Sequence, residues 1–314
     1  MNHTTDYQFR EASLPNTSHF FGKVSIPPVT IAKMLRSISN SIYWHHLARQ
    51  YSGSSITPRA LILTEIDGKT GYAKITLNRA PVNALNLEMI SAITSTVNAL
   101  ERDKVNGMVL TSFSDKVFSA GLDIKEMINP DIDRLRTFWS ALQELWLKLY
   151  GCAIPTVAAI NGHAPAGGCF LAIACDYRVM CNNFTIGLNE TVLGIIVPRW
   201  LQVTMRNTIG FRQTELACTT GKLFNSTEAF DIGLVDELVD NNMEAIRKAV
   251  LYLDKCKTSF ATARQITKHQ LRQDEFNDFK RYREKDLEAF VANTMREEFQ
   301  IELEEYLKAL KVKP

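Results

Sequence analysis

The chain has 314 residues, of which 46% are hydrophobic and 22% charged, and its formal net charge is +2. This length is enough for one large domain or two small ones with a sizeable core. No apolar run approaches the roughly eighteen residues of a membrane-spanning helix, and the small net charge gives no argument for nucleic acid or an anionic membrane as the main partner. The six cysteines form no CxxC pair, so we expect neither a zinc site nor a disulfide framework.

The first 55 residues differ in composition from the rest. No Asp or Glu occurs in the stretch Ala12–Thr64, whereas Lys, Arg and Ser are frequent and some apolar residues share a rough helical face. An acid-poor, Ser-rich, amphipathic stretch of this kind is typical of a mitochondrial transit peptide. We therefore expect residues 1–55 to be an N-terminal extension, with Met34 as a second candidate start and cleavage near Tyr51 and Ser52. The alternative is a polar tail without a targeting role, and the transit peptide predicts the mitochondrial matrix.

Residues 56–258 alternate strand and helix patterns, which predicts an α/β core domain. Strands are expected at 60–67, 72–78, 107–112, 155–160 and 177–180, and helices at 87–100, at 132–149 and from 169 onward. Beyond Trp200 the spacing indicates helices at 212–219, 226–232, 243–253, 260–271 and 274–310. We assign 259–314 to a C-terminal helical region, which either packs on its own subunit or forms an oligomer contact.

Two turns with glycine lead from a strand toward a helix, FSAGLDIK at 118–125 and NGHAPAGG at 161–168. Such turns present free backbone N–H groups, and glycine lets a ligand approach them. Neither turn matches the phosphate-binding patterns GxGxxG or GxxxxGK, and each alone could be a plain turn. Within them, we expect Asp123 to cap a helix and His163 to have a structural role.

Glu190 is the single carboxylate of the stretch FTIGLNETVLGIIVPRW, Phe184–Trp200. Burial raises the pKa of a carboxyl group, and a raised pKa suits a group that takes and returns a proton near neutrality. The alternative is an exposed acid in a loop. Phe184, Leu188 and Trp200 are expected in the core, and the sequence gives no role for Arg199.

Together, FSAGLDIKEM at 118–127, NGHAPAGGC at 161–169 and IGLNETVLGI at 186–195 resemble the three signature segments of the crotonase (enoyl-CoA hydratase/isomerase) superfamily, in the same order and at similar spacing. The resemblance covers roughly residues 60–255. It implies a crotonase-like spiral of ββα units with C-terminal helices that often build homotrimers. It also implies an acyl-CoA thioester as substrate. Coenzyme A would arrive as part of that substrate, with no separate cofactor.

The resemblance also implies roles for particular residues. The backbone N–H groups of Leu122 and Gly167 would hold the thioester oxygen, and Glu190 would carry protons. Further substrate contacts would come from the segment around the first donor and from the residue before the base, namely Ala120, Gly121, Leu122, Asp123, Ile124 and Asn189. Lys125 would lie near the nucleotide end of coenzyme A.

Hydratases of this superfamily carry a second glutamate, and Phe170 occupies the matching position here. A single carboxylate beside an aromatic residue that helps exclude water resembles the mitochondrial isomerases of the superfamily. These move the double bond of a 3-enoyl-CoA to the 2-trans position through a dienolate, in the β-oxidation of unsaturated fatty acids. The alternatives are an enoyl-CoA hydratase and a catalytically silent acyl-CoA-binding or RNA-associated relative.

Overall fold

The computed structural model describes residues 60–312, so the predicted extension, with Met34 and the cleavage near Tyr51 and Ser52, lies outside the described residues. The described chain begins with a hairpin of β1 (Ile62–Ile66) and β2 (Tyr72–Leu77), which pair antiparallel. The predicted first two strands are thereby confirmed.

Four parallel strands extend this hairpin into the main sheet: β3 (Gly107–Ser112), β4 (Thr156–Ile160), β6 (Tyr177–Cys181) and β9 (Glu237–Val239). Among the described residues the strand order is β1-β2-β3-β4-β6-β9. Strands β3 and β4 are buried along their whole length, which explains why they read as nearly continuous apolar runs in the sequence.

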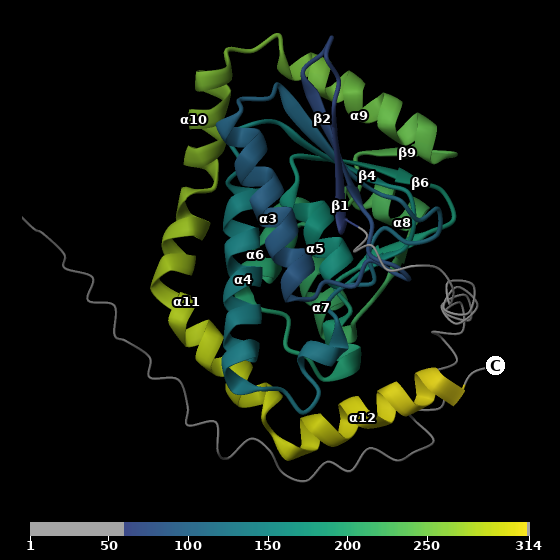
Figure 1. Ribbon diagram of the computed structural model, residues 1–314, viewed down its shortest axis with the longest axis vertical. Helices are drawn as coiled ribbons and strands as arrows, with labels where there is room; N and C mark the ends of the chain where they lie inside the picture. The colour runs from purple at the N-terminus through teal and green to yellow at the C-terminus, as the bar shows by residue number, and fades with distance from the viewer. Residues whose placement is uncertain (1–59, 313–314) are drawn as a thin grey trace, which may run out of the picture. The chain divides into compact units, whose positions relative to one another are not determined.

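Helices cover both faces of this sheet (Figure 1). On one face α9 (Asn242–Cys256) packs its small residues Ala245 and Ala249 against the strands. The other face belongs to the larger hydrophobic core, which is built with α3 (Leu87–Arg102), α4 (Ile132–Tyr150) and α5 (Gly167–Ala174). The chain thus repeats strands followed by a helix, as predicted for an α/β domain.

A second, small sheet brings two distant loops together. It consists of β5 (Ala164–Pro165), β7 (Thr185–Gly187) and β8 (Phe224–Asn225), in the order β5-β7-β8, with α8 (Ser226–Asp231) directly after it. Two short 3-10 helices complete the loops, η3 (Ile124–Glu126) and η4 (Glu190–Leu193). The small sheet was not predicted, because its strands are two or three residues long.

The region after η4 contains a helix that the sequence analysis missed. Helix α6 (Arg199–Ile209) precedes α7 (Phe211–Thr220), and Gly210, with φ +80°, separates them. One residue of the buried face of α6 is the polar Thr204, whose hydroxyl accepts a hydrogen bond from the indole of Trp146. A polar residue on the buried face weakens the apolar periodicity from which helices are predicted.

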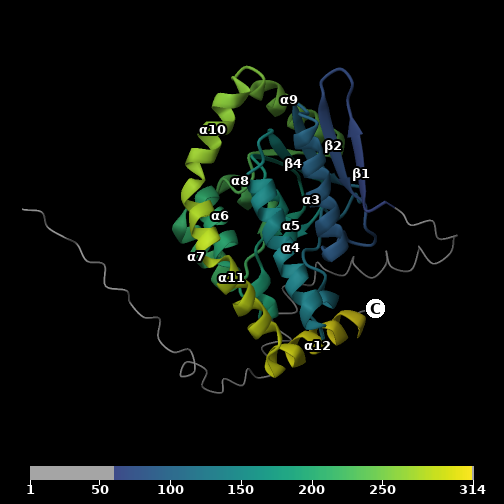
Figure 2. The same ribbon diagram turned by 60° about the vertical axis from the view of Figure 1, so that its left-hand side comes forward.

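The C-terminal region forms α10 (Ala261–Leu271), α11 (Gln273–Thr294) and α12 (Glu297–Val312), so the long helical segment predicted at 274–310 is divided near Met295. Helix α11 runs beside α4 (Figure 2), and the rings of Trp139 and Phe290 stack 3.6 Å apart between them. Within residues 60–312 no helix is both long and apolar enough to cross a bilayer.

Candidate active site

The turn at Leu122 offers a free backbone donor. The Leu85 N–H donates to the Gly121 carbonyl (2.8 Å), and the Asp123 N–H donates to the Leu85 carbonyl (3.0 Å). In such a parallel bridge the middle residue's own N–H and C=O point away from the partner segment. No acceptor for the Leu122 N–H is found among the described residues, so this donor is available to a ligand.

The second donor is the first residue of α5. The sequence placed the start of this helix at Cys169, but it begins at Gly167, whose N–H belongs to the first turn and has no intrahelical acceptor. Ala166 before it has φ +48° and ψ −118°, a conformation that costs a residue with a side chain about 1–3 kcal/mol. Strain of this kind persists where the surrounding structure fixes the backbone, here directly at the predicted donor.

The two donor turns are in contact. A Cβ atom added to Gly121, which has φ +90°, would lie 2.9 Å from the Gly167 nitrogen. A Cβ atom on Gly167 would lie 3.0 Å from the Gly121 Cα. Side chains at either position would push the turns apart, which explains why both residues are glycines. The structure therefore brings the segments of Leu122 and Gly167 together, as the sequence predicted.

The small sheet brings Glu190 to the same place. Strands β5 and β7 run parallel with Pro165 opposite Gly187, and the Ala166 N–H donates to the Gly187 carbonyl (2.8 Å). The chain leaving β5 reaches Gly167 two residues later, and the chain leaving β7 reaches Glu190 three residues later. Because both strands end at the same edge, the segments that carry Gly167 and Glu190 leave the sheet side by side.

The Glu190 side chain is buried, and one of its two oxygens has no hydrogen-bond partner among the described residues. The residue is 5% exposed, and the oxygen without a partner is Oε2. Burial raises the pKa of Glu190 from 4.5 to about 7, opposed by a hydrogen bond with its own backbone. A buried polar atom without a partner, on a carboxyl that titrates near neutrality, points to a functional group. The neighbouring Asn189 has an equally unpartnered Oδ1 atom.

Two buried thiols lie close enough to Glu190 to respond to its charge. Burial, and secondarily the charge of Glu190, raises the pKa of Cys169 well above its ordinary value and that of Cys218 to about 11. Both therefore stay neutral, and neither neutralises the carboxylate. The sequence analysis described only the uncharged stretch around Glu190 and did not predict that these two thiols lie near it.

A cavity of about 440 Å³ borders the turn that carries the base. Its walls come from η4, α6 and α7 and include Thr191, Ile195, Phe211 and Cys218, but not the Glu190 side chain itself. Cavities of this size accommodate small-molecule ligands. Open space of ligand size thus lies directly beside the Glu190 turn.

Phe170 occupies the position at which the resemblance places a second acid. It is fully buried in the first turns of α5, and its ring packs edge-on against Trp200 at 5.8 Å. Leu188 is buried as well, whereas Phe184 is half-buried and packs against the ring of His163 at 5.1 Å. The core positions predicted for Leu188 and Trp200 are confirmed.

His163 and Asp123 have the structural contacts that the sequence predicted. The Thr185 N–H donates to Nδ1 of His163 (3.2 Å), and burial lowers the pKa of the imidazole. Asp123 caps η3 by accepting from the Lys125 N–H (3.2 Å). Lys125 is exposed. The substrate contacts expected from Ala120, Gly121, Leu122, Asp123, Ile124 and Asn189 stay predictions.

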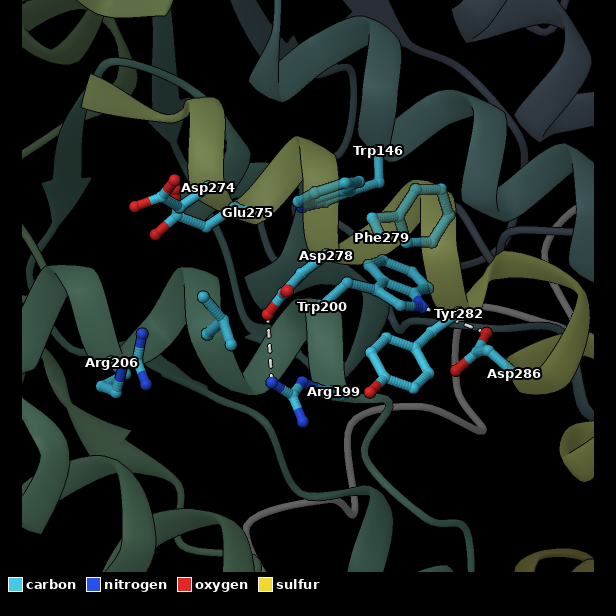
Figure 3. Close-up of a pocket in the computed structure, with 11 residues that line it drawn as sticks. Trp146, Arg199, Trp200, Arg206, Asp274, Glu275, Asp278, Phe279, Tyr282 and Asp286 are labelled. Atoms are coloured by element: carbon cyan, nitrogen blue, oxygen red, sulfur yellow. Dashed lines mark hydrogen bonds and ion pairs between the residues drawn. The ribbon is translucent and has the colours of Figure 1, made fainter. Parts of the chain in front are cut away.

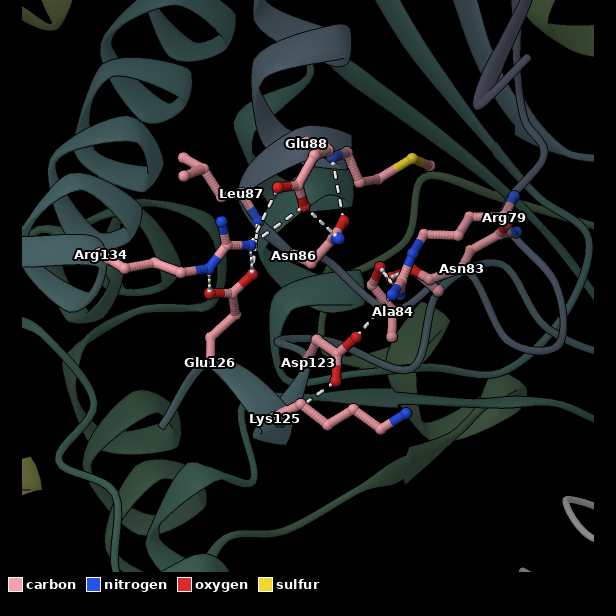
Figure 4. A network of polar contacts seen from close by, with 12 residues as sticks. Arg79, Asn83, Ala84, Asn86, Leu87, Glu88, Asp123, Lys125, Glu126 and Arg134 are labelled. Carbon is pink, nitrogen blue, oxygen red and sulfur yellow. Dashed lines mark hydrogen bonds and ion pairs between the residues drawn. The ribbon is translucent and has the colours of Figure 1, made fainter. Parts of the chain in front are cut away.

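Sequence reasoning missed two ion pairs formed by the acidic residues that follow Leu122, Asp123 and Glu126 (Figure 4). Arg79 pairs with Asp123 (2.7 Å), and Arg134 pairs with Glu126 (2.7 Å). The sequence analysis assigned no role to Glu126, which is 7% exposed. Because Arg79 lies 44 residues before Asp123, no local pattern could reveal their pairing.

Arg199, for which the sequence gave no role, joins α6 to α11 (Figure 3). Its guanidinium pairs with Asp278 (3.0 Å) and lies 5.4 Å from the ring centroid of Tyr282. The indole of Trp200 donates to Asp286 (3.2 Å) on the same helix. The cavity between these helices is small, about 120 Å³, so we assign Arg199 to helix packing.

The fold and the sequence define a class of proteins: the chain belongs to the enoyl-CoA hydratase/isomerase family, whose model matches residues 67–313. Among its relatives, enoyl-CoA delta isomerase 1, mitochondrial, of Rattus norvegicus is 40% identical over 255 residues, covering 80% of this chain and 88% of the relative. The predicted resemblance is thereby confirmed.

Solved structures agree with this assignment. The human mitochondrial delta3-delta2-enoyl-CoA isomerase superposes with a TM-score of 0.78 at 39% identity, covering 80% of this chain and 98% of that one. An enoyl-CoA hydratase from Bacillus halodurans superposes with a TM-score of 0.71 at 26% identity, covering 78% of this chain and 99% of that one. The predicted crotonase-like fold is confirmed. Within residues 60–312 no cluster of His, Cys, Asp and Glu could hold a metal ion.

Proposed function

We propose that this chain is an enoyl-CoA isomerase, which converts 3-enoyl-CoA into 2-trans-enoyl-CoA in the oxidation of unsaturated fatty acids. The observation that carries the proposal is Glu190, a buried carboxyl group with one unpartnered oxygen and a pKa raised to about 7. The similarity to enoyl-CoA delta isomerase 1 over 80% of the chain supports the same reaction.

The reaction requires one proton to leave C2 and one to arrive at C4. The Glu190 carboxylate removes the C2 proton, and the electron pair moves into a dienolate with its charge on the thioester oxygen. The N–H groups of Leu122 and Gly167 donate to that oxygen. The Glu190 carboxyl then returns the proton at C4, so substrate and product have the same formula. A group whose pKa lies near neutrality can perform both transfers.

Phe170 favours isomerisation over hydration. Hydration requires a water molecule held for attack on the double bond, and the fully buried ring of Phe170 offers no acceptor for one. The unpartnered oxygen of Glu190 also argues against a silent acyl-CoA-binding relative, because binding alone gives no reason to bury a lone carboxyl group.

The proposed enzyme acts in the mitochondrial matrix as a homotrimer, without a separate cofactor. The relatives from rat, mouse and human are mitochondrial proteins, which supports the location. Helix α10 has no buried residue and exposes Ile266 and Leu271, which supports a subunit contact in the C-terminal region. Light scattering tests the homotrimer, and N-terminal sequencing of the mature protein tests whether the transit peptide is removed.

Conversion of 3-hexenoyl-CoA, followed by the rising absorbance of the conjugated product, tests the proposed function. Glu190→Gln should lower kcat about 10²–10⁴-fold while binding of hexanoyl-CoA changes little. The matched control is Glu65→Gln on β1, whose exposed side chain lies outside the site. Wild-type rates in Glu190→Gln, or 3-hydroxyacyl-CoA as the main product of the wild type, would overturn the proposal.

A further inference from the structure

The guanidinium of Arg79 connects two chain segments at the first donor turn. Its Nη2 donates to Oδ2 of Asp123 (2.7 Å), and its Nη1 donates to the Ala84 carbonyl (2.7 Å). Asp123 follows Leu122 directly, and Ala84 precedes Leu85, whose backbone accepts from Asp123 and donates to Gly121. Figure 4 shows Arg79 reaching both Ala84 and Asp123.

Arg79 is itself held at its base. Its backbone N–H donates to Oδ1 of Asn83 (2.8 Å), and the Asn83 amide donates to the Phe118 carbonyl (3.0 Å) and to the Ser112 hydroxyl (2.8 Å). Asn83 is 3% exposed. The arginine therefore extends from a buried network that already includes the start of the 118–125 turn.

The direction of the Leu122 N–H depends on the position of the Leu85 backbone. The peptides on both sides of Leu122 are fixed through hydrogen bonds to Leu85. These bonds persist only while the 84–85 segment stays beside residues 121–123. A planar guanidinium that donates to two acceptors at once fixes their relative geometry more tightly than a single ammonium group can.

We propose that Arg79 is a positioning residue of this enzyme, which acts through Asp123 to aim the Leu122 N–H at the thioester oxygen. The inference rests on the proposed function, since it assumes that the oxygen binds at this donor. Arg79 does not need to touch the substrate. Its effect should therefore appear where negative charge develops on the oxygen, in the enolate, and less in the binding of a ground-state thioester.

The test compares Arg79→Met, Arg79→Lys, Asp123→Asn and the double variant Arg79→Met/Asp123→Asn. Because removal of a whole oxyanion donor costs about 10²–10³ in kcat, we expect misalignment to lower kcat about 10–100-fold, with KM changed less than about threefold. Arg79→Lys should have a kcat between those of Arg79→Met and the wild type, because an ammonium group replaces only part of the guanidinium contacts. The double variant should lose little more than Arg79→Met, since the two residues act as one unit.

A second readout does not depend on turnover. Acetoacetyl-CoA ionises to an enolate that absorbs in the near ultraviolet, and a well-aimed donor raises the enolate fraction of the bound ligand. Arg79→Met should lower that fraction at a given pH, whereas the Kd of hexanoyl-CoA should change less than about threefold. Circular dichroism establishes that each variant is folded.

The matched control is Lys148→Met. The ion pair between Lys148 and Glu101 (2.8 Å) has side-chain exposures of 28% and 17%, close to the 25% and 13% of Arg79 and Asp123, but it joins α4 to α3. Lys148→Met should leave kcat and the enolate fraction unchanged. Equal losses in this control would overturn the proposal, because the effect would then be one of general stability.

Two further outcomes separate the alternatives. If Arg79→Met weakens hexanoyl-CoA binding more than about tenfold and leaves the enolate fraction unchanged, Arg79 is a contact for the anionic part of coenzyme A and the proposal is wrong. If the wild type does not isomerise 3-hexenoyl-CoA, the proposed function fails, while the enolate titration still decides on the role of Arg79.

Discussion

Two glutamates, Glu126 and Glu190, are buried to nearly the same extent, at 7% and 5% exposure, yet their surroundings are opposite. Glu126 accepts from the Leu87 N–H (3.1 Å) and from Nε and Nη2 of Arg134 (2.9 and 2.7 Å). One oxygen of Glu190 has no partner among the described residues. Burial alone therefore does not distinguish these two carboxylates, whereas the donors around each of them do.

The comparison has a physical basis. The donors around Glu126 come from Leu87 and Arg134, so this carboxylate holds separate chain segments together. Glu190 has only a hydrogen bond with its own backbone to oppose desolvation, and burial raises its pKa to about 7. One acid contributes to the stability of the fold, and the other can exchange a proton at the expense of stability.

The largest expected effect in this comparison is a gain of stability in Glu190→Gln at pH 8. Because its folded-state pKa is raised above the ordinary 4.5, Glu190 destabilises the fold progressively from pH 4.5 to 7 and fully above that. Removing the charge should raise the free energy of unfolding by roughly 3 kcal/mol at pH 8 and leave it unchanged at pH 4. Urea denaturation at both pH values measures this, and an equal gain at both would contradict the raised pKa.

The opposite sign is expected for Glu126→Gln. The neutral amide keeps one acceptor but loses the charged hydrogen bonds to Arg134, so the free energy of unfolding should fall by about 2 kcal/mol. The same urea denaturation at pH 8 provides the measurement. A change in Glu126→Gln below about 0.5 kcal/mol would show that the partners of Glu126 have little energetic importance.

The pH dependence of the reaction sharpens the same contrast. Since Glu190 must be ionised to take the C2 proton, kcat/KM should rise about tenfold per pH unit below 7 and level off above it. Steady-state assays with 3-hexenoyl-CoA from pH 5.5 to 9 give the profile. Glu126→Gln should leave its midpoint unchanged. A midpoint near 4.5 in the wild type would mean that Glu190 is solvated in the working enzyme.

The smallest expected effect concerns salt. Arg134 is 46% exposed at its side chain, so ions can screen its pairing with Glu126. The deficit of Glu126→Gln should therefore shrink by about 0.5 kcal/mol between 0.1 and 1 M NaCl. The gain in the free energy of unfolding of Glu190→Gln should not change with salt, because Glu190 has no ion-pair partner among the described residues. Equal salt responses of the two variants would remove the distinction drawn between them.

Most of the fold could be predicted from the sequence because its elements depend on local patterns. The apolar runs at 107–112 and 155–160 are strands β3 and β4. The resemblance of the three signature segments implied the roles of Leu122, Gly167 and Glu190, and these roles stay predictions. The structure brings the turn of Gly121 into contact with Gly167, and the small sheet sets the segments of Gly167 and Glu190 side by side.

What the sequence did not reveal depends on contacts between distant segments. Arg79 and Asp123 are 44 residues apart, and Arg134 reaches Glu88 over 46 residues. Helix α6 was missed because Thr204 interrupts its apolar face. The division between α11 and α12 near Met295 was missed because charged residues continue across it. Such features are decided by packing partners that no sequence window contains.

Helix α12, the last of the described elements, lies against the loop after η3 and against the end of η4. Gln300 accepts from the Asn129 N–H (2.8 Å) and donates to the Met127 carbonyl (2.9 Å), directly after η3. At the end of η4, a Cβ atom on Gly194 would lie 2.9 Å from Oε2 of Glu302. Helix α12 thus completes the surroundings of two loops that lie far before it in the sequence. A variant that stops after Thr294 would keep Glu190 and both donor turns and still lack these contacts.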